Sequence, residues 1–310
     1  MSALICGSMA FDTIMVFQDQ FKNHILPEQV HILNVSFLVP ELRRNFGGCA
    51  GNIAFNLRLL GGDGVPMGTV GSDFGPYYDW LGSHQIRCDA LREVPGTFTA
   101  QAYITTDQDD NQITAFHPGA MNHAHQNRVE AVDGVNVGIV SPDGRQGMIE
   151  HAAQFAAAGI PFIFDPGQGM PMFDADDLNR FVYQATWLAF NDYEAKLMQE
   201  RTGKSPAQLA REVEAVVVTR GSAGSTIYAD GDAIDIPLAP AQHLVDPTGC
   251  GDAYRAGLLF GLQHGLDWEI TGRIASLMGA IKIEHAGTQN HALTRADFDA
   301  RFRETFGFSL

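Results

Sequence analysis

Short apolar segments alternate with helical segments along most of the chain. Each apolar segment is continuous rather than alternating with polar residues, which is typical of strands that are buried on both faces of a parallel sheet. We predict strands at 3–7, 65–71, 135–140, 160–165, 187–190 and 215–219. We predict helices at 51–61, 146–158, near 177–184, from Asp192 onward, and at 252–265. This order indicates a doubly wound α/β fold, in which helices cover both faces of a mostly parallel sheet.

Two segments do not follow this alternation. Residues 13–36 and 98–117 contain strand-like runs but no convincing helix. In the second segment, FTAQAYITT and NQITAFH flank the polar turn at 107–111, which predicts a β-hairpin. We interpret the two segments as a small separate sheet inserted into an α/β core, and as a candidate lid over a ligand. An extension of the main sheet edge is the alternative. The core then comprises residues 1–12, 37–97 and 118–310.

The charge and cysteine content exclude several classes of protein. The chain has 36 Asp and Glu against 20 Lys and Arg, a net charge of -16 and no basic run, so we expect no nucleic-acid partner. The four cysteines form no C-x-x-C pair, as in a reduced cytoplasmic protein. The N-terminus lacks a signal-peptide pattern, and no apolar run approaches the roughly 18 residues of a membrane span. We therefore expect a cytoplasmic monomer or homodimer that binds a small molecule.

The segment DPTGCGDAYRAG (246–257) carries the strongest functional signal. Gly249 and Gly251 leave backbone amides free of side-chain cover just before a helix that is apolar on nearly every side. Such a helix N-terminus attracts anions. Asp252 either caps the helix or takes a proton from a substrate hydroxyl while the amides of residues 249–251 hold a phosphoryl group. Taken alone, the spacing does not decide between these interpretations.

This segment resembles the D-T-x-G-A-G-D signature of the ribokinase-like (PfkB-type) carbohydrate and nucleoside kinases. It departs from the signature at Pro247, which is inserted, and at Cys250, where alanine is usual. The resemblance implies a ribokinase-like fold, with Asp252 as general base and Gly249, Cys250, Gly251 and Asp252 forming an anion hole. It also implies that Asp246 lies near a monovalent-cation site, with potassium as the candidate ion.

Two further elements resemble the substrate-binding motifs of this family. Gly47, Gly48 and Asn52 match a G-G-x-x-x-N element before a helix, and Asp12 follows the first strand at the position of an aspartate that accepts from two sugar hydroxyls. An Asn amide can both donate to and accept from a hydroxyl. As isolated features, an Asp after a strand is often a turn residue, and paired glycines often serve helix packing. Because Asp12 and the G-G-x-x-x-N element occur in the same order along the chain as in the family, the resemblance implies that they form a substrate site.

The resemblance also implies ATP and Mg²⁺ as cofactors. Asn191 and Glu194 lie on one helical face and resemble an N-x-x-E element that orders magnesium through its water shell. A helix cap with a first-turn glutamate is the alternative. Nucleotide contacts are implied for Thr219, Gly221, Gly224 and Asn290.

The stretch 24–52 resembles the bacterial purine nucleoside kinases of the family, some of which are named adenosine kinases. It implies ATP-dependent phosphorylation of the 5′-hydroxyl of a ribonucleoside, although neither spacing nor periodicity shows this preference. A ribose or fructose kinase is the alternative within the family. A dinucleotide-dependent oxidoreductase does not fit, because the turn after the first strand reads GSMAFD instead of G-x-G-x-x-G.

Overall fold

The computed structural model describes residues 2–25, 32, 34–109 and 111–310. Its main sheet has nine strands in the order β13-β12-β11-β10-β9-β8-β1-β4-β5. All of its pairings are parallel except those of β12, which runs antiparallel to both β11 and β13. The strands are β1 (Ser2–Cys6), β4 (Gly64–Val70), β5 (Leu91–Glu93), β8 (Val135–Val140), β9 (Phe162–Phe164), β10 (Trp187–Asn191), β11 (Ala215–Thr219), β12 (Ser225–Ala229) and β13 (Asp232–Ile236). The predicted doubly wound, mostly parallel sheet is confirmed.

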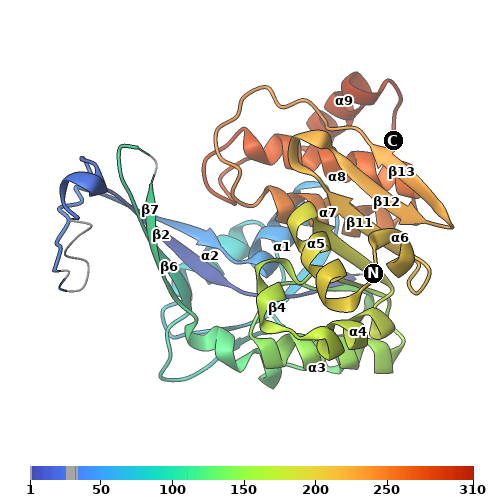
Figure 1. Ribbon diagram of the computed structural model, residues 1–310, viewed down its shortest axis with the longest axis horizontal. Helices are drawn as coiled ribbons and strands as arrows, with labels where there is room; N and C mark the ends of the chain where they lie inside the picture. Colours follow the sequence, from blue (N-terminus) through green and yellow to red (C-terminus); the bar gives the residue numbers. More distant parts are fainter. Residues whose placement is uncertain (1, 26–31, 33, 110) are drawn as a thin grey trace.

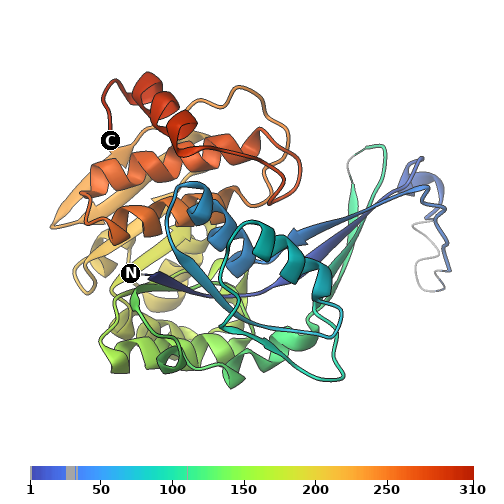
Figure 2. The ribbon, with the colours of Figure 1, turned by 180° about the vertical axis from the view of Figure 1, so that it is seen from behind.

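The sheet separates two hydrophobic cores, because successive side chains of a strand point to opposite faces. In β1, Ala3 and Ile5 belong to one core, whereas Leu4 and Cys6 belong to the other. The first core is covered by α1 (Cys49–Leu59), α2 (Gly75–Ser83), α7 (Cys250–Gln263), α8 (Trp268–Ile283) and α9 (Arg295–Phe306). The second is covered by α3 (Arg145–Ala158), α4 (Ala175–Gln184), α5 (Asp192–Thr202) and α6 (Pro206–Leu209). Figures 1 and 2 show these two helical layers.

Helix α7 is buried along most of its length, as predicted. Glycines let it approach α8 closely: a Cβ at Gly257 would lie 2.4 Å from the Cα of Ala275. This packing holds the N-terminus of α7 in a defined place relative to the sheet. Although α7 and α8 are rich in apolar residues, no helix in the described part of the chain combines the length and hydropathy of a membrane span.

A second sheet of four strands stands apart from the main one, in the order β3-β2-β6-β7. Its strands are β2 (Ala10–Val16), β3 (Glu41–Gly47), β6 (Ala100–Thr106) and β7 (Gln112–His117). The predicted hairpin within 98–117 is confirmed by the antiparallel pairing of β6 and β7. In the ribbon view this small sheet projects from the body as an arm (Figures 1 and 2).

The boundaries of the small sheet differ from those predicted. Residues 10–12 and 41–47 were expected in the core, but they form part of β2 and all of β3. The segment ELRRNFG (41–47) has no continuous apolar run, and its first residues are exposed. It becomes a strand because β2 offers it an unpaired edge, a tertiary cause that local sequence does not report. Within the predicted segment 13–36, residues 26–31 and 33 lie outside the described residues, and residues 34–36 form no strand.

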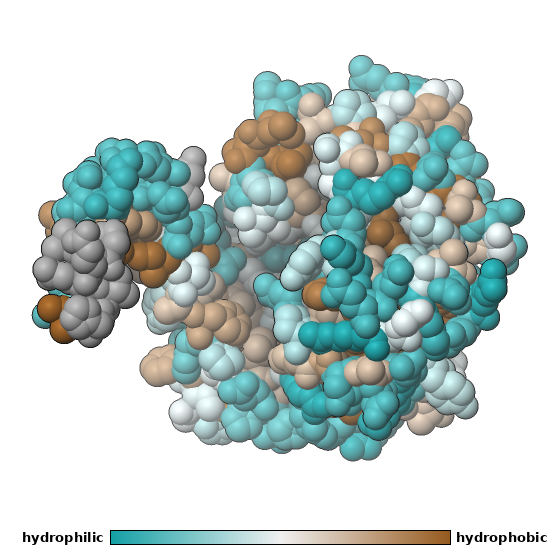
Figure 3. Space-filling model, in the orientation of Figure 1, coloured by the Kyte–Doolittle hydropathy of each residue, from teal (hydrophilic) through white to brown (hydrophobic). Residues whose placement is uncertain are grey.

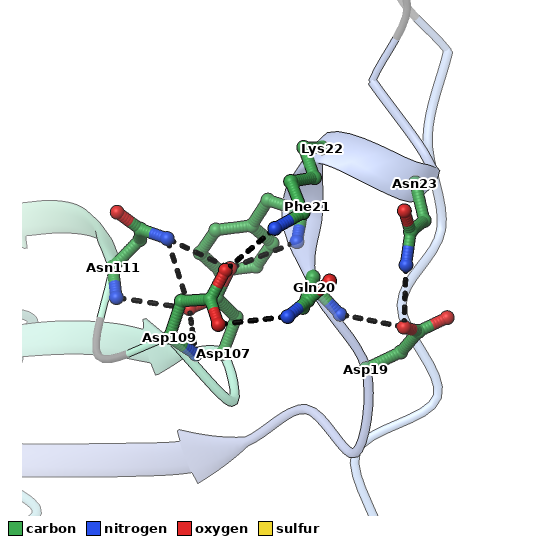
Figure 4. A network of polar contacts seen from close by, with 8 residues as sticks. All are labelled: Asp19, Gln20, Phe21, Lys22, Asn23, Asp107, Asp109 and Asn111. Atoms are coloured by element: carbon green, nitrogen blue, oxygen red, sulfur yellow. Dashed lines mark hydrogen bonds and ion pairs between the residues drawn. The ribbon is translucent and has the colours of Figure 1, made fainter.

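A network of polar contacts closes the tip of the arm (Figure 4). The Asp107 carboxylate accepts hydrogen bonds from the backbone amides of Phe21 (2.9 Å), Asp109 (3.0 Å) and Asn111 (2.9 Å). Asp109 also forms an ion pair of 2.9 Å with Lys22. These contacts join the segment after β2 to the turn between β6 and β7, so that two distant stretches of the chain form one unit.

Candidate active site

Several of the residues that the sequence singled out lie near the carboxyl ends of the parallel strands. Asn191 and Thr219 are the last residues of β10 and β11 and are paired in register. Asp165 directly follows β9. In open α/β sheets, ligands bind beyond these carboxyl ends. A space-filling view shows the surface hollowed between the arm and the main body (Figure 3).

Asp252 is the third residue of α7, but it does not cap this helix. The N-cap is Gly249, and within the described chain no side chain caps α7. The Asp252 carboxylate instead accepts a hydrogen bond of 2.8 Å from Nδ2 of Asn52, on α1. The structure therefore rules out simple capping as the reason for this aspartate. It brings together two predicted site residues that are 200 positions apart in the chain.

The surroundings of Asp252 adjust its acidity. Burial raises the pKa of Asp252 to about 6, whereas the hydrogen bond from Asn52 lowers this pKa in part. The carboxylate of Asp165 raises the pKa further, and the guanidinium of Arg255 lowers it. Asp165 and Arg255 form a buried ion pair with two hydrogen bonds of 3.0 Å. Asp252 is thus ionised at neutral pH but is a stronger base than a solvated aspartate.

A buried chain of hydrogen bonds holds Asn52, and its other members were not predicted from the sequence. Nε2 of Gln289 donates to Oδ1 of Asn52 (2.9 Å) and to the hydroxyl of Tyr77 (2.5 Å). That hydroxyl donates to the carbonyl of Gly47 (2.9 Å), and Nε1 of Trp80 donates to Gln289 (3.0 Å). Because Oδ1 of Asn52 accepts a bond, its Nδ2 must face Asp252. A single glutamine in a loop has no distinctive sequence pattern. The only sequence signal near Gln289 was its neighbour Asn290, a predicted nucleotide contact.

The backbone of residues 249–251 provides donors for an anion. Gly249 has a φ of 80°, which favours glycine, and a Cβ there would lie 3.0 Å from Thr288 Cγ2. A Cβ at Gly251 would meet no atom within 4 Å, so this residue faces open space. The Cys250 amide already donates to the carbonyl of Pro247 (3.2 Å). Of the four residues predicted to form the anion hole, Gly249, Gly251 and Asp252 have amides without an acceptor among the described residues.

Asp12 and Gly47 lie together on neighbouring strands of the small sheet. A Cβ at Gly47 would lie 2.5 Å from Oδ2 of Asp12, so the glycine makes room for this carboxylate. Gly48 has a φ of 86° and packs against the backbone of residues 8–10. Burial raises the pKa of Asp12 to about 6, and the nearby charge of Asp246 contributes to the rise. The predicted substrate residues therefore face the loop that precedes α7.

Asp246 is held by backbone amides on both sides. Its carboxylate accepts hydrogen bonds from the amides of Thr248 (2.9 Å) and Gly287 (2.8 Å). Burial opposes ionisation, but these bonds outweigh it, and the pKa of Asp246 is lowered. The carbonyl oxygen of Asp246 accepts a bond of 2.8 Å from the ammonium of Lys282.

Glu194 forms a capping box with Asn191 at the start of α5. Its carboxylate accepts bonds of 2.8 Å from both the backbone amide and Nδ2 of Asn191, while its own amide donates to Oδ1 of Asn191 (2.7 Å). Burial and the charge of Asp165 raise the pKa of Glu194. Each carboxylate oxygen retains a lone pair. Glu194 can therefore still accept a hydrogen bond from metal-bound water while it completes the capping box.

The predicted nucleotide residues lie in two separate places. Thr219 ends β11, and Gly221 and Gly224 follow in a tight turn with φ values of 53° and 77°. This turn adjoins α7, because Ser225 is hydrogen-bonded to Tyr254 (2.6 Å). Asn290 is exposed and donates to the carbonyl of Ala286 (3.0 Å). Nδ2 of Asn290 and Nδ2 of Asn45, on β3, both lie near Gly287, so Asn290 adjoins the small sheet.

Comparison with known proteins assigns this arrangement to a family. The chain matches the model of the pfkB family of carbohydrate kinases over residues 11–295. It belongs to that family, and it is a phosphotransferase with a hydroxyl group as acceptor.

Among its relatives, several are nucleoside kinases. The chain is 31% identical over 263 residues to the nucleoside kinase of Methanocaldococcus jannaschii, covering 84% of this chain and 86% of that protein. The structure of Burkholderia thailandensis nucleoside kinase in complex with inosine is 52% identical, with a TM-score of 0.89 over 99% of both chains. The same enzyme in complex with ADP-inosine is 53% identical, with a TM-score of 0.87 over 99% of this chain and 97% of that one.

Proposed function

We propose that the protein transfers a phosphoryl group from ATP to the 5′-hydroxyl of a ribonucleoside, and that purine nucleosides are its preferred substrates. The proposal depends mainly on the Asp252 carboxylate, which Asn52 orients beside the open backbone at Gly251. The relatives named above support a nucleoside as the acceptor, since one of them was solved with inosine. We also propose a cytoplasmic location, because a kinase needs a supply of ATP.

In the proposed reaction, Asp252 accepts the proton of the substrate hydroxyl as that oxygen attacks the phosphoryl group. Its pKa of about 6 leaves it ionised at neutral pH and close to the value at which a base is most effective. Asp12 and Asn52 bind the ribose hydroxyls, and Gly47 and Gly48 let the ribose approach the backbone. The free amides of Gly249 and Gly251 then stabilise the negative charge of the phosphoryl group.

The nucleotide side of the proposal uses the ends of β10 and β11. Thr219, Gly221 and Gly224 would contact the nucleotide, and Asn290 would close over the base from the loop near β3. Asn191 and Glu194 would hold the water shell of a magnesium ion, which supplies positive charge to the phosphate oxygens when bound.

One face of the small sheet favours a nucleoside over a free sugar. The register pairs Asp12 with Ala102, and Ala102 with Phe116, so the three side chains lie in a row on the same face. Phe116 is 52% exposed and available for stacking on a base. Two strand spacings separate it from Asp12, or about 10 Å. A ribose bound at Asp12 would not reach Phe116, whereas the base of a nucleoside would.

We also propose that the small sheet is a lid that excludes water during phosphoryl transfer.

A coupled ADP-release assay with adenosine, inosine, guanosine, ribose and fructose tests this function. We expect turnover with purine nucleosides and little with the free sugars. Phe116→Ala should raise KM for nucleosides by about 10-fold or more, because base–aromatic stacking contributes roughly 1–3 kcal/mol. Tyr103→Ala is the matched control, because Tyr103 lies on the opposite face of the same sheet and is 43% exposed. Faster turnover of ribose or fructose than of any nucleoside would contradict the proposal.

A further inference from the structure

Lys282 is a fully buried lysine next to the proposed anion hole. Its relative exposure is 0%, although lysine is rarely buried without a partner. The ammonium donates to the carbonyl oxygens of Asp246 (2.8 Å) and His285 (3.1 Å). It belongs to the last turn of α8, where the helix dipole favours a positive charge.

The two carbonyl groups belong to the loops on either side of α7 and α8. Asp246 begins the segment that leads to Gly249, and His285 begins the loop that carries Gly287 and Gln289. The same two loops are joined by the hydrogen bond between the Gly287 amide and the Asp246 carboxylate. One ammonium therefore holds together the segment that presents the free amides and the loop that orients Asn52.

The contacts of Lys282 conflict with a dissolved monovalent cation in this place. A potassium ion needs several oxygen ligands, of which backbone carbonyls are the usual ones. Here the carbonyls of Asp246 and His285 both accept from the ammonium, so a potassium ion on the same oxygens would lie beside a positive charge that repels it. The expected potassium site beside Asp246 therefore does not fit the residues present.

We propose that the Lys282 ammonium is the resident monovalent cation of this loop, so that the anion hole forms without dissolved potassium. The inference rests on the proposed catalytic role of the backbone amides at residues 249–251. Lys282 is a positioning residue, because it acts through the backbone of Asp246 and His285. Its charge also faces the anion hole: it lowers the pKa of Cys250, which burial raises to about 11.

The first test measures the response of the unmodified protein to potassium. Initial rates are compared in KCl and in tetramethylammonium chloride at equal ionic strength, with the best substrate of the nucleoside and sugar panel. We expect no change in kcat or KM. A rate that rises with potassium would overturn the inference.

The second test creates an empty site. Lys282→Ala in tetramethylammonium chloride should lower kcat by on the order of 10-fold or more, and ammonium or potassium ions should restore part of the rate. Lys204→Ala is the control, since Lys204 contacts Asn179 and Glu212 away from the site. Full activity of Lys282→Ala without either ion, or a loss that neither ion repairs, would contradict the inference.

A third measurement does not depend on turnover. An ion that binds only the folded state raises the Tm of the protein. The Tm of Lys282→Ala should therefore be higher in potassium chloride than in tetramethylammonium chloride. The Tm of the unmodified protein should be the same in the two salts. This difference in Tm does not depend on which substrate the protein phosphorylates. If Lys282→Ala did not fold, Lys282→Met would replace it in the activity assay, where we expect the same loss without rescue by either ion. An equal Tm of Lys282→Ala in the two salts would overturn the inference.

Discussion

Helices α5 and α7 both carry a carboxylate at their third position, but the two carboxylates have different roles. In α5 the N-cap is Asn191, and Glu194 folds back onto it in a capping box. In α7 the N-cap is Gly249, which has no side chain to pair with, and Asp252 is bound by Asn52 from α1. The identity of the N-cap residue therefore decides whether a first-turn carboxylate completes its own helix or is available to the site.

The largest effect expected from this difference is on turnover. Asp252→Asn should lower kcat by on the order of 10²–10⁴-fold, because an amide cannot accept the proton. Steady-state kinetics with a nucleoside substrate would measure the loss. Asp267→Asn is the matched control, because Asp267 caps the neighbouring helix α8 by accepting from the Ile270 amide. A kcat for Asp252→Asn close to that of the control would mean that Asp252 is not the base.

Gly251→Ala and Gly257→Ala should separate activity from stability within α7. The Cβ at residue 251 meets open space, so the fold should tolerate it, while kcat should fall by up to about 10²-fold because the methyl group displaces the phosphoryl group. At residue 257 the Cβ would lie 2.4 Å from the Cα of Ala275, so the main loss should be in stability. Kinetics and thermal unfolding of both variants test this contrast. Unchanged kcat in Gly251→Ala would remove the anion hole from the mechanism.

Two substitutions of Glu194 should separate its capping role from its proposed role with magnesium. Glu194→Gln can keep the capping box, so we expect little loss of stability but a higher KM for magnesium-bound ATP. Glu194→Ala should in addition lose about 1 kcal/mol of unfolding free energy. Denaturant unfolding and a magnesium titration of the rate would measure both. Equal ATP kinetics in all three proteins would leave Glu194 with the capping role alone.

The smallest expected effects are on the pH dependence of the rate. The rate should fall as pH drops through about 6, where Asp252 is protonated. Asn52→Leu should move this limb to higher pH, because the hydrogen bond that it removes lowers the pKa of Asp252. A profile that is flat from pH 5 to 8 would contradict this assignment of the base.

The same raised pKa has a consequence for stability. The pKa of Asp252 in the folded protein, about 6, exceeds the ordinary aspartate value of 3.8. The stability that this group contributes is therefore present at low pH and is lost as pH rises through about 6. Asp252→Asn should therefore gain more stability relative to the unmodified protein at pH 7.5 than at pH 5. Thermal unfolding at the two pH values measures this difference, and an equal effect at both would refute it.

Much of the α/β core could be predicted from local sequence. The buried strands are continuous apolar runs, and the glycine-rich turn before α7 predicts uncovered backbone amides at a helix N-terminus. The strand β3 could not be predicted in this way, because ELRRNFG is polar and pairs only when β2 is beside it. Nor could Gln289, Tyr77 and Lys282, whose functions depend on partners far away in the chain.

By itself, the sequence determined the fold class, because apolar periodicity is a local property, and the resemblance of its motifs indicated the family and the residues available for phosphoryl transfer. Only the tertiary structure decided which carboxylate is free of its helix, which amides remain without acceptors, and which buried cation joins the two loops. The physical reason is that hydrogen-bond acceptors and donors are shared among distant segments, so the partners of a buried polar group depend on parts of the chain that its local sequence does not report.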